Sequence, residues 1–194
     1  MNGLRYPVTI ERLPPLAVFE ARGPEAELSA AVAAAGLPWP AALHEYTLGA
    51  DGLDLVRLGP TRCLVIGPSQ AQAAGVARLA AAFDDQPTAD AVDVSDMLTG
   101  LAVTGSGAED VLRQGAPLDL DATRFPARRM TGTELWGVTV LLGRLPLPAG
   151  GFRILVDIAF AAFIEEWLSV ASGAPSVHRP GTMARPPARL RPSP

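Results

Sequence analysis

Short strand-like and helix-like segments alternate along the chain, and this alternation occurs twice in its 194 residues. In the first half the order is strand, helix, hairpin, helix, strand, at residues 16–19, 26–35, 44–66, 69–83 and 91–94. The 19 glycines and 19 prolines supply the turns that this order needs and argue against a long helical bundle. The order of elements is typical of a ferredoxin-like α+β sandwich.

A similar alternation begins again at residues 101–103. Ser106 and Glu109 have the spacing of a capping box, which predicts a short helix from that point. Residues 133–142 are rich in β-branched residues and predict one strand, while residues 152–158 alternate as in a strand with one buried and one wetter face. We therefore expect an α+β protein of two fused ferredoxin-like βαβ lobes.

Two helices show apolar stripes at helical spacing. Ser69 is a candidate N-cap for the second helix of the first half, and the final helix completes the second lobe. The residues expected to face the core are Val76, Leu79, Ala80 and Phe83 in the former and Phe160, Phe163, Ile164, Trp167 and Leu168 in the latter. Trp136 is also expected to lie in the core.

The composition changes near residue 174. Residues 174–194 contain six prolines and four arginines (Arg179, Arg185, Arg189 and Arg191) and cannot form a core. We predict one domain over residues 1–173 and a Pro/Arg-rich tail over residues 174–194 that is disordered or extended unless a partner orders it.

The charge distribution argues against several classes of partner. Residues 1–173 carry 12 arginines and 20 acidic residues, a net charge of −8, so we expect no nucleic-acid binding, which needs clustered cations. No apolar run is long enough to span a membrane, and the start of the chain has no secretory signal pattern. With Cys63 as the single cysteine, these features predict a protein of the reducing cytoplasm.

The common catalytic, nucleotide-binding and metal-binding motifs are absent from the sequence. Cys63 lies in an apolar run, which predicts a buried structural thiol. Asp93 and Ser95 share a strand face and Asp96 follows, so acid/base chemistry is conceivable, but a polar turn at a strand end is the favoured interpretation. His44 would have to work nearly alone, since His178 lies in the tail.

Five residues are candidates for a partner interface. Arg124, Arg128 and Arg129 surround Phe125 in a segment without periodicity, and arginine and aromatic residues are enriched at interfaces. Trp39, between Pro38 and Pro40, lies outside any periodic element. A solvated loop remains an equal alternative for the arginine segment.

The order of several short motifs resembles a known family. The motifs are Gly36-Leu37-Pro38-Trp39-Pro40, Leu58-Gly59-Pro60, Val92-Asp93-Val94-Ser95-Asp96-Met97, Leu101-Ala102-Val103-Thr104-Gly105, Leu118-Asp119-Leu120, Phe125-Pro126, Phe160-Ala161 and Trp167-Leu168. Over residues 13–172 the chain resembles the gamma subunit of heterotetrameric sarcosine oxidase, which is related to the folate-binding region of the glycine-cleavage T-protein. The resemblance implies lobes of the T-protein folate-binding type.

Departures from the T-protein pattern bear on catalysis. The T-protein carries its catalytic acid in the region corresponding to residues 136–142, where this chain has no acid, and Glu134 lies just outside. Asp96 stands where T-proteins commonly have histidine, and Ile158 replaces an arginine that the gamma family often has. The resemblance therefore implies a scaffold that is not itself catalytic and holds no cofactor.

What the resemblance implies is an accessory role in a complex. Alpha, beta and delta subunits would hold FAD, FMN, NAD and tetrahydrofolate, oxidise the N-methyl group of sarcosine to give glycine, and pass on the one-carbon unit. The gamma subunit would pack chiefly against alpha, stabilise it and expose apolar surface on one face. Two alternatives remain: an autonomous folate-dependent aminomethyltransferase, and the same accessory role in an N-methylglutamate-type dehydrogenase.

Overall fold

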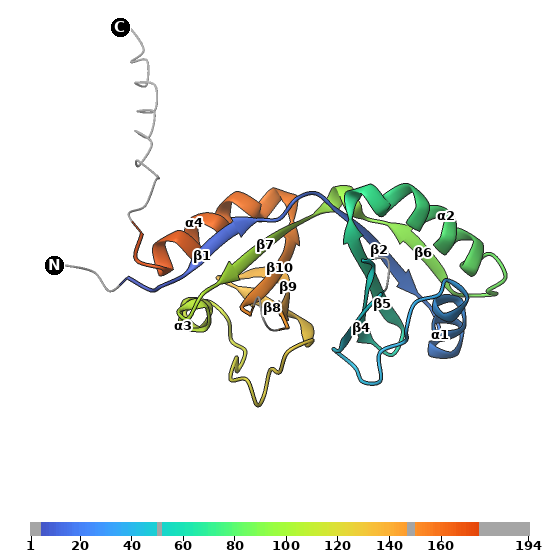
Figure 1. The fold of residues 1–194 in the computed structure, drawn as a ribbon, viewed down its shortest axis with the longest axis horizontal. Helices are drawn as coiled ribbons and strands as arrows, with labels where there is room; N and C mark the ends of the chain where they lie inside the picture. The colour runs from blue at the N-terminus through green and yellow to red at the C-terminus, as the bar shows by residue number, and fades with distance from the viewer. Residues whose placement is uncertain (1–4, 50–51, 147–149, 175–194) are drawn as a thin grey trace, which may run out of the picture.

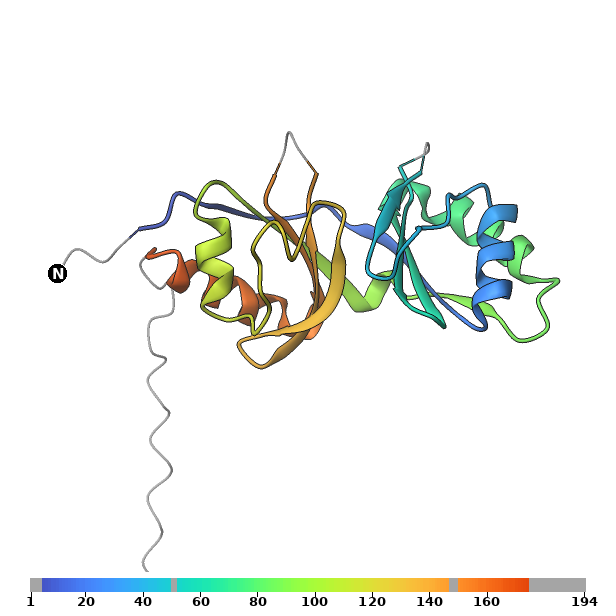
Figure 2. The same cartoon turned by 90° about the horizontal axis from the view of Figure 1, so that it is seen from below.

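The computed structural model describes residues 5–49, 52–146 and 150–174, which form two lobes that each contain a five-stranded antiparallel sheet (Figures 1 and 2). The strands are β1 (Thr9–Arg12), β2 (Leu16–Arg22), β3 (Tyr46–Leu48), β4 (Asp54–Gly59), β5 (Arg62–Pro68), β6 (Asp90–Asp93), β7 (Leu98–Thr104), β8 (Met130–Leu135), β9 (Val138–Arg144) and β10 (Phe152–Asp157). The helices are α1 (Glu25–Ala34), α2 (Gln72–Phe83), α3 (Ala108–Arg113) and α4 (Ala161–Ala171), with short 3-10 turns at Ser69–Ala71, Ser95–Met97 and Ile158–Phe160.

The two sheets have the same topology. The first lobe has the strand order β6-β2-β5-β4-β3, and the second has β1-β7-β10-β9-β8. In each, four strands follow the ferredoxin-like arrangement and one extra strand is added at an edge. The two-lobed α+β fold predicted from the sequence is confirmed.

The first strand of the chain, β1, belongs to the second lobe. β1 precedes the first lobe in sequence but pairs with β7 of the second, with Ile10 opposite Val103. It thereby takes the place that β6 holds in the first sheet. The chain thus crosses between the lobes twice, from β1 to β2 and from β6 to β7, so the first lobe is one continuous segment and the second is built from two (Figure 1).

Each sheet has one face covered by helices and one face turned toward the other lobe. In β5, Cys63 and Val65 pack with α1 and α2, while Leu64 and Ile66 point to the opposite face. That second face meets Met130 of β8 and Leu155 of β10 in a core shared by both lobes. The period-2 alternation of side chains therefore gives four layers, with helices outside and two sheets inside.

Most predicted elements of the first half are confirmed. α1 ends just before Gly36, whose φ of 72° suits a glycine that ends a helix. β3 and β4 form the expected hairpin, and β5 lies between β4 and β2 as an interior strand. His44, however, lies outside β3 with a φ of 65°.

The prediction of one strand over residues 133–142 is wrong. The chain turns at Trp136 and Gly137, with φ of 48° and 81°, and β8 and β9 form a hairpin around them. A two-residue turn with both φ positive is the geometry that suits tight hairpins. Trp136 is nevertheless half-buried against the second lobe, because its ring lies over Gly115, where a Cβ atom would collide with it.

Both predicted helix caps are also wrong. α2 has Ala71 at its N-cap and α3 has Gly107 there, and neither position makes a side-chain capping hydrogen bond. Ser69 instead begins a 3-10 turn, and Glu109 forms ion pairs with arginines. In α2 the predicted stripe is half right, because Leu79 and Phe83 are buried whereas Val76 and Ala80 are exposed.

Two predicted burial patterns change because of tertiary packing. β10 has no fully wet face, because Leu155, which is 1% exposed, enters the core between the lobes and Arg153 forms an ion pair with Asp54. In α4 the predicted stripe is divided: Ile164 and Leu168 are buried, whereas the aromatic members of the stripe are exposed. The predicted disorder of the tail falls on residues that, apart from Ala174, lie outside the described part of the chain.

Candidate partner interface

Four of the five predicted interface residues lie between α3 and β8, on residues 116–129, which we call the arginine loop. Arg124 and Arg128 are exposed and Arg129 is half-buried. Among the residues that the structure describes, none of these three guanidinium groups has an ion-pair partner. The three charges are thus free of close ion pairs, although Arg128 interacts electrostatically with Asp54 and the loop also holds Asp119 and Asp121.

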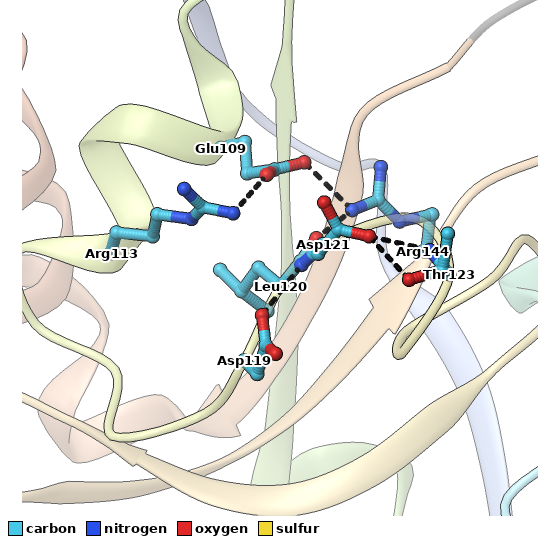
Figure 3. Close-up of polar contacts among 7 residues, drawn as sticks. All are labelled: Glu109, Arg113, Asp119, Leu120, Asp121, Thr123 and Arg144. Atoms are coloured by element: carbon cyan, nitrogen blue, oxygen red, sulfur yellow. Dashed lines mark hydrogen bonds and ion pairs between the residues drawn. The ribbon is translucent and has the colours of Figure 1, made fainter.

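Arg144 at the end of β9 holds the loop in place (Figure 3). Its Nη2 donates to Glu109 Oε2 at 2.9 Å and to the carbonyl oxygen of Leu120. Its guanidinium carbon lies 4.6 Å from the centre of the Phe152 ring, and Glu109 also pairs with Arg113 at 2.6 Å. One mostly buried arginine therefore ties together α3, β9, β10 and the loop, with a single terminal nitrogen making both hydrogen bonds and the guanidinium lying over the Phe152 ring.

Aspartates shape the turn within the loop (Figure 3). Asp121 Oδ1 accepts from the backbone N–H of Thr123 at 2.9 Å and from its hydroxyl at 2.6 Å, and these hydrogen bonds lower the pKa of the Asp121 carboxyl. The Asp121 backbone N–H in turn donates to Asp119 Oδ1 at 3.1 Å. Such side-chain-to-backbone turns fix a loop without a strand or helix.

Phe125 does not belong to the surface that the sequence suggested. Its side chain is 1% exposed and packs in the core of the second lobe. Its backbone N–H donates to the Asp121 carbonyl at 2.7 Å. Phe125 is therefore the apolar anchor of the arginine loop, and the arginines around it point outward because it points inward.

The end of the loop is hydrogen-bonded to the first lobe. The Arg128 carbonyl accepts from the Tyr46 N–H at 2.9 Å, and Glu45 forms a β-bridge with Arg129. The Tyr46 hydroxyl also donates to the Arg144 carbonyl at 3.0 Å. Because both lobes hold it, the arginine loop is a rigid surface rather than a free loop.

Trp39, the remaining candidate, lies in the first lobe. Its ring is half-buried against the core of that lobe, and the guanidinium carbon of Arg57 lies 5.3 Å from the ring centre. Arg57 in turn pairs with Glu25 at 2.6 Å. Part of the Trp39 ring is therefore covered by contacts within this chain.

Residues considered for chemistry have structural roles. Cys63 is fully buried, and burial raises the pKa of its thiol to about 12. Ser95 donates from its N–H to Asp93 and accepts the Val18 N–H at 2.9 Å, which makes a polar turn at the end of β6. Asp96 and Glu134 are both exposed. No group of three His, Cys, Asp or Glu side chains suited to a metal ion occurs within the described ranges.

His44 lies between the lobes in a strained conformation. Its Nδ1 is buried without a hydrogen-bond partner, and desolvation followed by the positive charge of Arg129 lowers the pKa of the imidazole. Its carbonyl accepts the Met130 N–H at 2.7 Å and its N–H donates to the Arg57 carbonyl at 2.6 Å. Through these two hydrogen bonds, the backbone of His44 links the two lobes.

Two features could not be found by reading along the sequence. A cavity of about 320 Å³ lies between the lobes, where Leu141 and Leu155 meet the Glu20–Arg62 ion pair. Large apolar side chains also gather, exposed, on and just before α4; these are Ile158, Phe160, Phe163, Trp167 and Val170. The cavity can be located only once the positions of both sheets are known. The exposure of the apolar side chains depends on which side of α4 packs on the sheet.

Comparison with solved structures defines the class of protein. The chain superposes on aminomethyltransferase T of the glycine cleavage system from Bartonella henselae with a TM-score of 0.67, over 88% of this chain and 48% of that one. At 16% identity this similarity establishes the fold alone. The molecule is therefore a two-lobed α+β protein with the T-protein fold, whose described residues include no helix long and apolar enough to cross a membrane.

Comparison of amino-acid sequences points to one family within this fold. The chain is 34% identical over 140 residues to the sarcosine oxidase gamma subunit of an Arthrobacter species, covering 72% of this chain and 66% of that subunit. It is 32% identical over 118 residues to that of Corynebacterium strain P-1, covering 61% of this chain and 56% of the subunit. No family model matches the chain.

Comparison with a solved complex supports the same family. A chain of the heterotetrameric sarcosine oxidase from Corynebacterium sp. U-96, solved with pyrrole 2-carboxylate, superposes with a TM-score of 0.77 at 26% identity over 91% of this chain and 90% of that one. The protein belongs to the family of sarcosine oxidase gamma subunits. The resemblance noted in the sequence is confirmed.

Proposed function

We propose that this chain is an accessory, non-catalytic subunit of a heterotetrameric sarcosine oxidase. Its kinship with gamma subunits and its likeness to a chain of a solved heterotetramer support the proposal. In such a complex it binds alpha, beta and delta subunits, chiefly alpha, and stabilises the alpha subunit. FAD, FMN, NAD and tetrahydrofolate are held by those partners, which convert sarcosine to glycine and transfer the one-carbon unit.

The observation that carries the proposal is the arginine loop. Residues 1–173 have a net charge of −8, yet this loop holds Arg124, Arg128 and Arg129 without carboxylate partners in a frame fixed by Arg144. Arginines on a fixed backbone need less ordering on binding than arginines on a free loop, and they match carboxylates through a planar fork. The partner surface that fits this loop is acidic.

The residues nearest to T-protein chemistry support a non-catalytic role. Glu134 lies on the exposed side of edge strand β8, and Asp96 is exposed at a turn. A general acid or base must be held within hydrogen-bond reach of the proton that it transfers. Among the described residues, no hydrogen bond or ion pair holds the carboxylate of Asp96 or of Glu134 in place.

Co-expression with the other subunits tests the proposal. Replacing Arg124, Arg128 and Arg129 together by serine should weaken association with the alpha subunit about tenfold or more, because each change removes a charge from the contact. The matched control is Arg22→Ser, which removes an exposed arginine from the first lobe. Undiminished assembly of the triple variant, measured by co-purification and sedimentation, would exclude the arginine loop as the contact.

A second arm tests the absence of catalysis. Asp96→Asn and Glu134→Gln should leave sarcosine oxidation and one-carbon transfer by the assembled complex unchanged. Loss of activity in a variant that still assembles would place catalytic chemistry on this chain. Turnover by the isolated chain with tetrahydrofolate would instead establish an autonomous aminomethyltransferase.

A further inference from the structure

The outer edge of β8, the side away from β9, is hydrogen-bonded at both ends. In a hairpin with a two-residue turn, hydrogen-bonded and non-hydrogen-bonded pairs alternate from the turn. The odd-numbered residues of β8 therefore bond to β9, and the even-numbered residues turn their N–H and carbonyl groups outward. The Met130 N–H donates to the His44 carbonyl at 2.7 Å, and the Trp136 N–H donates to the Gly115 carbonyl at 3.1 Å. The chain itself thus closes both ends of this edge.

The middle of the same edge is open. The outward N–H and carbonyl groups of Gly132 and Glu134 have no partner within the described ranges. β8 is also the longest of the four edge strands, with six residues against four in β1, four in β6 and three in β3. It contains one charged residue, no proline and no bulge. Natural edges are usually shortened, charged or kinked to prevent pairing, so this edge is suited to receive another strand.

The cavity between the lobes lies beside the open part of the edge. Gly132 lines this cavity of about 320 Å³ together with Leu98, Leu141 and Leu155. A Cβ atom at Gly132 would meet only the Leu141 side chain, at 3.9 Å, so this part of the cavity wall has no side chain of its own. A residue directly opposite Gly132 on an added strand would have its side chain on the same face of the sheet. That side chain would point into the cavity.

The lining of the cavity favours an apolar side chain. Its charged groups already have partners within the chain: Arg62 Nε donates to Glu20 Oε1 at 3.0 Å, and the Ala159 N–H donates to Asp157 Oδ1 at 2.8 Å. A charge brought in by a ligand would lose water without gaining a free partner, whereas an apolar group gains from burial. The side chain that fits is therefore large and apolar.

A second copy of this chain does not fit the edge. Symmetric antiparallel pairing of two β8 strands about Thr133 would set Glu134 of one copy opposite Gly132 of the other and direct a carboxylate into the apolar cavity. A partner subunit is favoured by position, because the arginine loop ends at residue 129 and β8 begins at Met130. One partner can therefore contact both.

We propose that an extended segment of the alpha subunit adds to β8 as an antiparallel strand and places one large apolar side chain in the cavity beside Gly132. Its backbone bonds to the outward groups of Gly132 and Glu134, and the Glu134 carboxylate is not used. The segment continues the antiparallel pairing that Glu45 begins in its β-bridge with Arg129. The inference rests on the proposed function, because the segment belongs to a subunit of that complex.

Three substitutions at Gly132 test the inference in the co-expressed complex. Gly132→Pro removes the outward N–H but no bond to β9, and edge strands accept proline at such positions; association with the alpha subunit should weaken about tenfold or more. Gly132→Phe occupies the cavity from within the chain and should weaken association similarly. Gly132→Ala keeps the N–H and most of the cavity, so it is the matched control and should assemble as the native chain does.

Amide hydrogen exchange in the native chain gives a readout that does not depend on how the variants fold. Exchange at Gly132 and Glu134 should be at least about tenfold slower in the complex than in the free chain, because both amides gain acceptors. The amides of Thr131 and Thr133 bond to β9 in both states and should change less. Mass spectrometry with fragmentation to single residues resolves these amides.

The outcomes separate this inference from the proposed function. Unslowed exchange at Gly132 and Glu134 in the assembled complex overturns the inference and leaves the proposed function standing, and so does undiminished assembly of the proline and phenylalanine variants. Failure of the native chain to assemble with the alpha subunit would instead overturn the proposed function, and the inference with it.

Discussion

Arg144 shows how one side chain can organise a surface that it does not belong to. It is mostly buried, with its charge balanced by Glu109 and its ring contact supplied by Phe152. Nothing in the sequence around it marks it as special, since it ends an ordinary strand. The arginine loop carries the exposed charge, but its shape depends on Arg144.

Replacing Arg144 by alanine should therefore destabilise the protein by about 2–4 kcal/mol, because Glu109 and the Leu120 carbonyl lose their donor. Amide hydrogen exchange within residues 116–129 should accelerate most. Arg144→Lys should recover only part of the loss, since an ammonium keeps the charge but lacks the planar guanidinium that lies over the Phe152 ring. The control is Arg113→Ala, a more exposed partner of Glu109, which should cost less than about 1 kcal/mol. Equal losses in the two alanine variants would contradict the role given to Arg144.

Glu20 provides a prediction about pH. Partial burial raises the pKa of its carboxyl, but hydrogen bonds from Arg62 and Arg22 outweigh this and hold the pKa below its ordinary value of 4.5. The folded state thus favours the charged form. The stabilisation is present above about pH 4.5 and is lost as the pH falls through the lower, folded-state pKa.

Glu20→Gln should consequently cost about 1 kcal/mol at neutral pH and almost nothing near pH 3, as measured by urea unfolding across this range. Glu134→Gln, at an exposed site, is the control and should change stability little at either pH. A Glu20→Gln cost that stays constant with pH would show that packing, not charge, is what the carboxylate contributes.

At the scale of elements, β1 is the segment whose role is least visible in the sequence. It has four residues and only Ile10 as an apolar member, so it shows little strand periodicity. Its place is set by hydrogen bonding to β7 and by Tyr6 and Val8, which lead into it and pack on the second core. It completes the sheet of the other lobe.

A chain that begins at Leu13 should therefore lose stability in the second lobe, by more than about 3 kcal/mol, because the edge of β7 loses its partner and part of the core loses its cover. A chain that begins at Arg5 keeps β1 and is the control. Hydrogen exchange should speed up in β7 and β10 more than in β4 and β5. Equal exchange in the two chains would mean that β1 is dispensable.

Secondary structure could be predicted for elements whose own residues show which face is buried in the core. α1 and β7 meet this condition, whereas β5 was predictable as an interior strand because it is a continuous apolar run, buried on both faces. The β8–β9 hairpin was missed because Trp136 is a poor turn former by type, and its positive φ is stabilised by the contact with Gly115. The capping box at Ser106 failed because Glu109 is drawn instead to Arg144 from a distant strand.

At the scale of the whole molecule, the contact between the two sheets decides which residues form the core. Leu155 lies there with Val18, Val56 and Met130, so each lobe supplies part of the other's interior. The Arg153–Asp54 ion pair, at 3.1 Å, joins the lobes beside it. The lobes should therefore unfold together.

Leu155→Ala should destabilise the protein by about 2–4 kcal/mol through the cavity it leaves between the sheets. It should also separate the unfolding of the lobes, seen as a broader calorimetric transition. Ile154→Ala is the matched control, because Ile154 is equally buried but faces the helices of its own lobe; it should destabilise without broadening. Identical transition widths would show that the shared core does not couple the lobes.

The sequence by itself determined the two-lobed α+β plan, the burial of Cys63 and the absence of familiar catalytic motifs, because these depend on local periodicity and residue type. It also marked Arg124, Arg128 and Arg129 as a surface segment. The tertiary structure alone decided that Phe125 is buried beneath them, that β1 belongs to the second lobe, that Leu155 of β10 is buried between the lobes and that α4 exposes its aromatic residues. Each of these depends on which distant element covers a given face, and no local pattern of side chains contains that information.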